Sequence, residues 1–133
     1  MHSLANQKAL YQTLSFMNQQ KSFSKIVLDA VAAIKQKIDS NPLQRKNISE
    51  LTSKIYIGKN ILHEAFKAVE GKTIARYQLE KRMEKACEML ETCTYTIQQI
   101  AAKCGYTDQA NFTNDFKRVF HISPKEWIKR NCH

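Results

Sequence analysis

The chain repeats one pattern of apolar and aromatic residues at an interval of 49 or 50 positions. Five residues between positions 48 and 77 have apolar counterparts between positions 97 and 127, and the pairs are Ile48 and Ile97, Leu51 and Ile100, Leu62 and Phe112, Phe66 and Phe116, and Tyr77 and Trp127. A repeat of this period indicates a duplicated structural unit. Any fold proposed for the chain must therefore hold two similar units within 133 residues.

A single long helix is predicted between the two copies, over residues 73–92. Apolar side chains recur there at steps of four, three, four and three residues, at Leu79, Met83, Ala86, Leu90 and Cys93. This spacing places all five on one stripe of an α-helix, so each is expected to be buried. The segment contains no Gly or Pro, and its roughly 20 residues would form a rod about 30 Å long.

The other segments are also predicted to be helical. Alternation typical of β-strands is absent over any useful length, and only three Gly and two Pro interrupt the chain. Together with the long helix, the predicted helices cover residues 25–39, 48–54, 59–70, 97–104 and 109–120 and a last helix that begins at Pro124. The fold class is therefore all-α, with about seven helices.

Residues that begin helices stand at similar places in the two copies. Asn47 with Glu50 and Thr96 with Gln99 form capping-box patterns, and Asp108 is placed to cap the helix over 109–120. In each copy, two short helices joined by a turn that contains Gly predict a helix-turn-helix.

Two helix-turn-helix subdomains joined by a long linker helix are thus expected in residues 25–133. The first lobe covers residues 25–72, the linker helix residues 73–93 and the second lobe residues 94–133. Residues 1–24 form an N-terminal leader in which Leu10, Leu14 and Met17 have helical spacing. We expect the leader to pack on the domain; the alternatives are self-association through it, or that it is the end of a sensor domain.

Positive charge is concentrated in the two repeated regions. The net charge of +9 divides into +6 for residues 1–72, zero for residues 73–95 and +3 for residues 96–133. A basic surface favours a polyanionic partner. Basic regions separated by a neutral linker favour a partner that is long and charged along its length.

The residues needed for other kinds of chemistry are missing from the sequence. The four cysteines include no CxxC pair and no cluster at zinc spacing, so no metal and no cofactor are expected. Cys87, Cys93 and Cys104 are expected to be free thiols that pack as small apolar residues. No Gly-rich phosphate loop or catalytic triad pattern stands out, which argues against an enzyme. Without a signal-peptide or membrane-spanning pattern, the expected location is the cytoplasm and no membrane partner is expected.

Polar residues cover the outward faces expected for the second helix of each helix-turn-helix. Asn and Gln can bond adenine through two hydrogen bonds, and small side chains can contact the thymine methyl group. The candidates for reading base edges of double-stranded DNA are Asn60, His63, Gln109, Ala110, Asn111 and Asn114. The candidates for holding DNA phosphates are Lys59, Lys67, Thr113, Lys117 and Arg118.

Each candidate also has a simpler interpretation. Any amphipathic helix presents polar residues to solvent, and for a single lysine this explanation is as good as phosphate contact. Asn111 could instead belong to the cap that Asp108 begins, and His63 could be an ordinary surface residue. Glu64 opposes the basic trend, and we rank solvent exposure first for it, then repulsion of the DNA backbone, then contact with cytosine.

Several short motifs follow one another in a recognisable order. They are Ile48…Leu62-x3-Phe66-Lys67-x3-Gly71, Tyr77-x4-Arg82-Met83-x2-Ala86-x2-Met89-Leu90, Ile97-x2-Ile100-Ala101-x3-Gly105-Tyr106, Asn111-Phe112-x3-Phe116-Lys117 and Ser123-Pro124-x2-Trp127. On these motifs, residues from about 26 to 130 resemble the DNA-binding domain of the AraC/XylS family of bacterial transcription regulators.

The resemblance implies a sequence-specific regulator, by family habit an activator, that inserts two recognition helices into successive major grooves. RNA polymerase and a sensor domain are the further partners that it implies. The chain departs from the family pattern where an Arg is common, at Glu64, Asn114 and Ile128, and it has Thr52 for a small Ala and His121 for a Gly. The usual guanine contacts are therefore not expected here.

The alternative function is a helical protein-interaction module. Such a module would dock on polymerase or a sensor partner without direct base readout. It would explain amphipathic helices, but it would explain neither the duplication nor the neutral linker.

Overall fold

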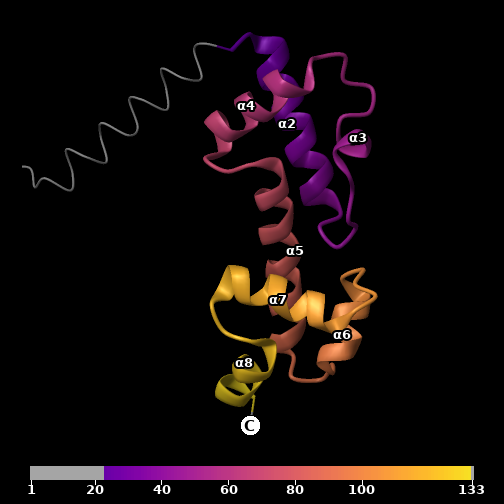
Figure 1. Cartoon of the computed structure of the whole chain (residues 1–133), viewed down its shortest axis with the longest axis vertical. Helices are drawn as coiled ribbons and strands as arrows, with labels where there is room; N and C mark the ends of the chain where they lie inside the picture. Colours follow the sequence, from indigo (N-terminus) through magenta and orange to yellow (C-terminus); the bar gives the residue numbers. More distant parts are fainter. Residues whose placement is uncertain (1–22, 133) are drawn as a thin grey trace, which may run out of the picture. The chain divides into compact units, whose positions relative to one another are not determined.

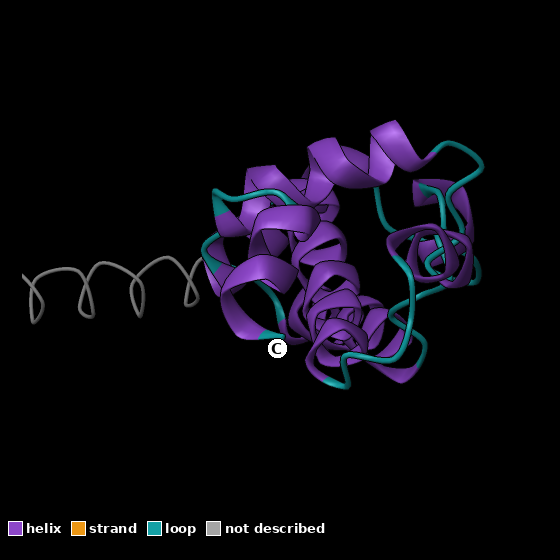
Figure 2. Ribbon diagram, turned by 90° about the horizontal axis from the view of Figure 1, so that it is seen from below, coloured by secondary structure: helices purple, strands orange, loops and turns teal. Residues whose placement is uncertain are grey.

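Residues 23–132 are described by the computed structural model, and they form seven helices without a strand (Figures 1 and 2). The helices are α2 (Lys25–Ser40), α3 (Ile48–Leu51), α4 (Lys59–Glu70), α5 (Ile74–Glu91), α6 (Ile97–Lys103), α7 (Gln109–Phe120) and α8 (Pro124–Asn131). The all-α prediction is confirmed, and the expected leader over residues 1–24 lies almost wholly outside the described residues. None of the helices in residues 23–132 has the length and apolar character needed to cross a bilayer.

The chain divides into two compact units. Among the described residues, the first unit holds 23–36 and 52–74, and the second holds 37–51 and 75–132. The second unit therefore contains α3, nearly all of α5, and the whole of α6, α7 and α8.

Helix α4 lies in the first unit and has one buried side. Leu62, Ala65 and Phe66 are buried along one side of it, as the sequence pattern predicted for Leu62 and Phe66. The helix ends at Gly71, whose φ of 77° is left-handed and whose N–H donates to the carbonyl of Lys67. Glycine is the usual residue at such a helix end because it has no Cβ to clash.

The second unit is built on the apolar stripe of α5. Leu79, Met83, Ala86 and Leu90 are all buried, as predicted. The side chains that join them in one cluster come from α6, α7 and the turn between them, and are Ile100, Ala101, Cys104, Tyr106, Phe112 and Phe116. Burial of one large apolar side chain stabilises a fold by about 1.5–3 kcal/mol, so this cluster is the main source of stability in the second unit.

Helices α6 and α7 form the second predicted helix-turn-helix. Thr96 and Gln99 make the expected reciprocal capping box at the start of α6. Gly105, with φ of 83°, lies in the turn, and the Asp108 side chain accepts a hydrogen bond from the N–H of Ala110 at the start of α7. The two helices pack on each other, and α6 ends at Lys103, one residue earlier than expected.

Helix α3 is shorter than the sequence predicted. The capping box of Asn47 and Glu50 is present, with both reciprocal hydrogen bonds below 3 Å. The helix ends at Leu51 instead of continuing to residue 54. Lys54 has a left-handed φ of 66°, and the N–H of Ile55 bonds the carbonyl of Thr52 in a turn. The predicted end of this helix was therefore wrong by three residues.

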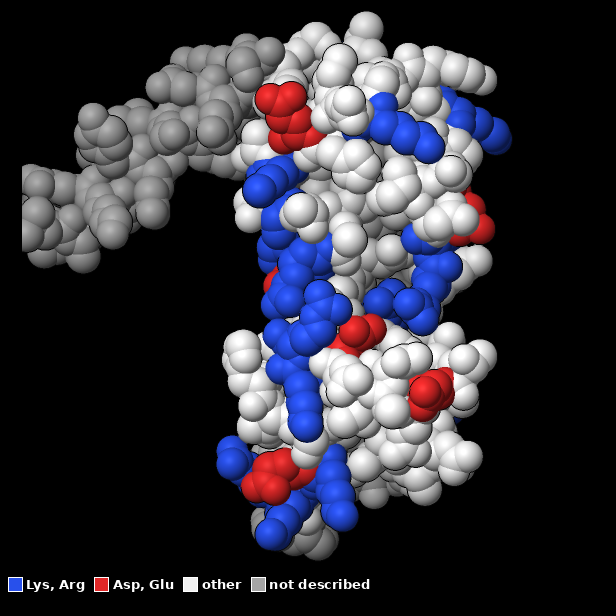
Figure 3. Space-filling model, viewed as in Figure 1, with Lys and Arg blue, Asp and Glu red and all other residues white. Residues whose placement is uncertain are grey.

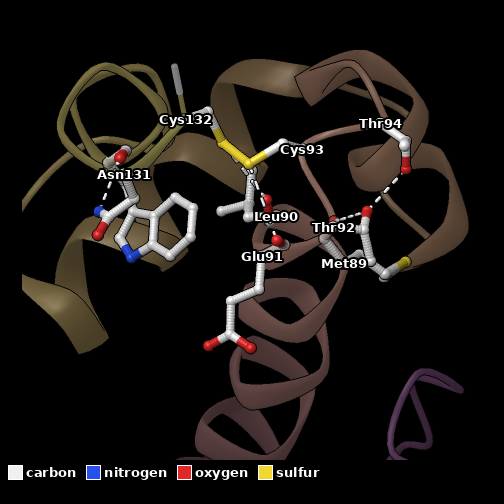
Figure 4. Close-up of a disulfide and its surroundings, with 9 residues drawn as sticks. Met89, Leu90, Glu91, Thr92, Cys93, Thr94, Asn131 and Cys132 are labelled. Carbon is white, nitrogen blue, oxygen red and sulfur yellow. Dashed lines mark hydrogen bonds between the residues drawn. A yellow bond between two sulfur atoms is a disulfide. The ribbon is translucent and has the colours of Figure 1, made fainter.

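Two cysteine predictions are also wrong. Helix α5 ends at Glu91, so Cys93 leaves the apolar stripe and is exposed, with a left-handed φ of 55°. Its sulfur is bonded to that of Cys132 at the end of α8, and the two Cα atoms are 5.8 Å apart (Figure 4). Cys87 and Cys104 are free, as predicted, and Cys104 is buried.

A polar network crosses the second unit and fixes α7 to α5. Arg82 is only 5% exposed, and its Nε donates to the hydroxyl of Tyr106 over 3.1 Å. That hydroxyl donates to Asp115 of α7 over 2.5 Å, and the Arg45 guanidinium lies 4.8 Å from the centre of the Tyr106 ring. Burial, followed by the hydrogen bond to Asp115, raises the pKa of Tyr106 to about 12.

Replacing Tyr106 tests this network. We expect Tyr106→Phe to lower the free energy of unfolding by about 1–3 kcal/mol at neutral pH, because it leaves Arg82 and Asp115 short of a buried partner. The raised pKa stabilises the native state below pH 10, and this contribution is lost as the pH rises toward 12. The difference between the wild type and the variant in urea unfolding should therefore shrink over that range. Tyr95→Phe, at an exposed position, is the control and should change stability little.

The residues that follow α4 and α7 share one left-handed backbone conformation but differ in side chain. This difference allows the cost of that conformation to be measured. His121 follows α7 as Gly71 follows α4, with φ of 66° and a hydrogen bond from its N–H to the carbonyl of Lys117. A left-handed conformation costs about 1–2 kcal/mol for residues other than Gly. Glycine also gives the unfolded chain more conformational freedom than histidine does, and this offsets part of the stability gained by removing the strain.

His121→Gly is therefore expected to raise the free energy of unfolding by about 0.5–1 kcal/mol. The matched change Gly71→Ala should lower it, although nothing lies within 4 Å of the added Cβ. Both are measured by urea denaturation, and a destabilised His121→Gly would show that the imidazole contributes more than the strain costs.

Candidate nucleic-acid interface

Helix α4 presents its predicted polar candidates to solvent. Lys59, Asn60, His63 and Lys67 are all exposed, as is Glu64. Asn60, Glu64 and Lys67 lie on the side of the helix opposite to the buried Leu62, Ala65 and Phe66. His63 lies at the edge of that side, and Lys59 is in the first turn. The first turn of α4 contains no acidic residue, so the partial positive charge of the helix N-terminus is not neutralised there.

Helix α7 shows the same division into an inner and an outer side. Phe112 and Phe116 are fully buried in the core cluster of the second unit. The exposed residues are Gln109, Ala110, Asn111, Asn114, Lys117 and Arg118. Thr113 is half-buried, so it lies at the edge of this face.

The exposed amides of α7 are available to a partner. Asp108 caps the helix through the N–H of Ala110, and Asn111 takes no part in that cap. Within residues 23–132, the side chains of Asn111 and Asn114 form no hydrogen bond or ion pair with the protein. The alternative that Asn111 serves the cap is therefore not supported. Unpaired amide groups on a convex helix face suit recognition of a hydrogen-bonding partner.

Basic side chains stand at the end of the α7 face. Arg118 is 64% exposed, and its guanidinium lies 3.3 Å from the carboxylate of Asp115. Asp115 thus joins this outward arginine to the buried network of Arg82 and Tyr106. The surface over α7 is mostly uncharged in the view of Figure 3, with Lys and Arg side chains to its left and acidic side chains above it and to its right. This arrangement suits base contacts by the amides and phosphate contacts by the basic residues.

Arg76 is a candidate that the sequence interpretation missed. Its Nη2 donates to the carbonyl of Arg118 over 3.5 Å, and its Nε pairs with Glu80 over 3.0 Å. This places a second guanidinium beside the basic end of α7. Because the two arginines are 42 positions apart, no local sequence pattern could have joined them.

Two exposed apolar residues in the first unit were also missed. Tyr56, in the turn before α4, is 97% exposed, and Ile61 on α4 is 47% exposed next to Asn60. The sequence signal that could have identified Tyr56 is an aromatic residue in the turn before α4. Both side chains can contact sugar or methyl groups of a partner.

Two further features of residues 23–132 do not favour another kind of site. Residues 23–132 contain no group of three His, Cys, Asp or Glu side chains that could hold a metal. An open surface depression of about 220 Å³ is lined by Asp39, Pro42, Lys81, Glu84, Lys85 and Glu88. Its lining contains both positive and negative side chains, and Lys81 and Lys85 pair with Glu84 and Glu88. The depression therefore does not form a binding site with a uniformly positive or negative charge.

Comparison with known proteins places these features in a family. Residues 51–130 match the family model described as a helix-turn-helix domain. The chain is 31% identical over 109 residues to the regulatory protein SoxS of Escherichia coli, covering 82% of this chain and 98% of SoxS. It is 29% identical over 86 residues to the probable transcriptional regulator LumQ of Photobacterium leiognathi, covering 64% of this chain but only 35% of LumQ.

A solved structure shows the same fold. The DNA-binding domain of AdpA, a global transcriptional factor determined in complex with a target DNA, superposes with a TM-score of 0.67 at 18% identity. The match covers 75% of this chain and 90% of that one. Taken with the helix-turn-helix match and the similarity to SoxS over nearly its whole length, it is consistent with the resemblance found in the sequence. The chain belongs to the AraC/XylS family of helix-turn-helix transcription regulators.

Proposed function

We propose that the chain binds double-stranded DNA sequence-specifically and activates transcription, with α4 and α7 inserted into successive major grooves. The observation that carries this proposal is the shared design of the two helices. Each has twelve residues, buries apolar side chains on one side and leaves polar side chains exposed on the other. The family membership and the fold shared with a domain solved on its target DNA support it.

In the second unit, α7 reads base edges through Gln109, Ala110, Asn111 and Asn114. Amide side chains can form two hydrogen bonds with adenine, and the Ala methyl group can contact a thymine methyl. The face contains no arginine before Arg118, so it lacks the side chain that most often reads guanine. We therefore expect the second unit to prefer sites that contain A·T pairs.

In the first unit, α4 reads bases through Asn60 and His63. Lys59 and Lys67 of α4 hold phosphates, as do Thr113, Lys117 and Arg118 of α7. Phosphate contacts supply affinity and fix the register of the protein on the duplex, whereas base contacts discriminate sequences. Glu64 is exposed beside these residues, and we assign it to solvent ahead of repulsion of the DNA backbone and contact with cytosine.

The lobes act as two DNA-binding subdomains over residues 25–72 and 94–133, joined by a linker over residues 73–93. Helix α5 has 18 residues, which corresponds to about 27 Å. This length is comparable to the roughly 34 Å repeat of duplex DNA. The further proposed partners are RNA polymerase and a sensor domain, and the chain is also proposed to self-associate through residues 1–24. The proposed location is the cytoplasm.

Replacing Asn114 tests base readout by α7. We expect Asn114→Ala to cost about 1–3 kcal/mol at one position of the selected site and to relax specificity at that position. The measurement is a set of affinities for duplexes that carry each base pair at each position. Asn41→Ala, in the loop after α2, is the control and should leave every affinity unchanged. An equal loss on all sequences would contradict a base-reading role for Asn114.

Replacing single lysines tests phosphate contact and separates the proposal from the protein-interaction alternative. Lys67→Ala and Lys117→Ala should each weaken binding to any duplex and lower the slope of log affinity against log salt by roughly one unit. Lys85→Ala, where the lysine pairs with Glu88 on α5, should leave the slope unchanged. A wild-type chain that shows no salt-dependent binding to random duplex DNA would favour the protein-interaction module.

A further inference from the structure

We propose that Cys93 and Cys132 form a reversible thiol–disulfide site, oxidised by a low-molecular-weight disulfide of the glutathione type, which controls how firmly α8 is held on the second unit. This modification site goes beyond the proposed DNA binding. The thiol chemistry at the site does not depend on whether the protein binds DNA.

The two cysteines stand at the ends of two helices that meet. Cys93 follows the last turn of α5, where its N–H donates to the carbonyl of Leu90 over 2.9 Å. Cys132 directly follows the last residue of α8, and its N–H donates to the carbonyl of Ile128 over 2.7 Å. The Cα separation of 5.8 Å lies in the middle of the range that a disulfide requires. The two helix ends therefore hold the sulfurs in a geometry that suits a disulfide (Figure 4).

The other two cysteines are poorly suited to exchange. Thiolates, not thiols, react with disulfides. Burial, aided by the nearby Glu91 and Glu88, raises the pKa of the Cys87 thiol, and burial raises that of Cys104 to about 11. Cys93, in contrast, is exposed, and Cys132 is half-buried in the bonded form. Redox chemistry is therefore confined to one pair out of four cysteines.

The proposed reaction is balanced by its co-reactant. A thiolate of the pair attacks one sulfur of the small disulfide, forms a mixed disulfide and releases one small thiol. The second cysteine of the pair then attacks the mixed disulfide and releases the other small thiol. The two cysteines lose two electrons and two protons in total, and the small disulfide becomes two thiols. Excess small thiol reverses both steps.

The bond matters because α8 has few other attachments. Pro124 is its one buried residue, and Trp127 and Ile128 are partly buried against the core cluster. The bond joins residues 39 positions apart and so encloses α6, α7 and α8 in one loop. A disulfide that closes such a loop reduces the conformational entropy of the unfolded chain. Since α8 packs on α7, reduction loosens the support of the proposed recognition helix.

Redox titration of the full chain tests the chemistry. The protein is equilibrated in glutathione buffers of rising thiol content, quenched with an alkylating reagent and mapped by mass spectrometry. We expect one reversible transition between a Cys93–Cys132 disulfide and two free thiols, with Cys87 and Cys104 free throughout. A bond that survives the most reducing buffer, pairs that include Cys87 or Cys104, or bonds between chains would each overturn the proposal.

Hydrogen exchange tests the control of α8. In the oxidised chain, amides of α8 should exchange slower than in the reduced chain, by on the order of tenfold. Cys93→Ser and Cys132→Ser should match the reduced chain in either buffer, and Cys87→Ser should match the wild type. Equal exchange of α8 in both redox states would overturn the proposed control.

A third measurement extends the proposal to DNA and rests on the proposed function. The oxidised chain should dissociate more slowly than the reduced chain from a duplex selected for binding, and Cys93→Ser should abolish the difference. Equal dissociation rates would overturn the link between α8 and DNA. Failure of both forms to bind any duplex would instead overturn the proposed function, while the first two measurements still decide the thiol site.

Discussion

The packing of the α5 stripe against the aromatic side of α7 is the interaction on which the second unit depends. Leu79, Met83 and Leu90 form one wall of the core, and Phe112 and Phe116 fill it. Because both phenylalanines point inward, residues on the opposite side of the helix point outward. Those outward residues include the amides that we assign to base readout. Apolar burial thus determines which chemistry α7 can offer to a partner.

The same logic appears twice in the chain, and the helix ends show it most clearly. Gly71 and His121 are 50 positions apart, and each follows its helix in a left-handed conformation with a hydrogen bond to a lysine carbonyl four residues earlier. The duplicated sequence therefore corresponds to a duplicated local structure. The two outward faces differ, since α4 carries His63 and Glu64 where α7 carries Thr113 and Asn114. Under the proposed function, a common scaffold with different faces would let one chain read an asymmetric site.

Most helices could be predicted because their signals are local. Periodic apolar residues and capping patterns such as Thr96 with Gln99 depend only on near neighbours, and the structure confirms them. The early end of α3 could not be predicted, because nothing in the sequence indicates that Lys54 adopts a left-handed conformation. The Cys93–Cys132 bond and the approach of Arg76 to Arg118 join residues far apart in the chain. Such pairs follow from tertiary packing, which spacing alone does not give.

Hydroxyl-radical footprinting on a duplex selected from a random library tests the central claim most directly. A protein that places two recognition helices in successive major grooves should protect two segments of the backbone on one side of the duplex, centred about 10–10.5 base pairs apart. Protection of a single segment, or of segments on opposite sides of the duplex, would contradict the claim that α4 and α7 act together on one face of DNA.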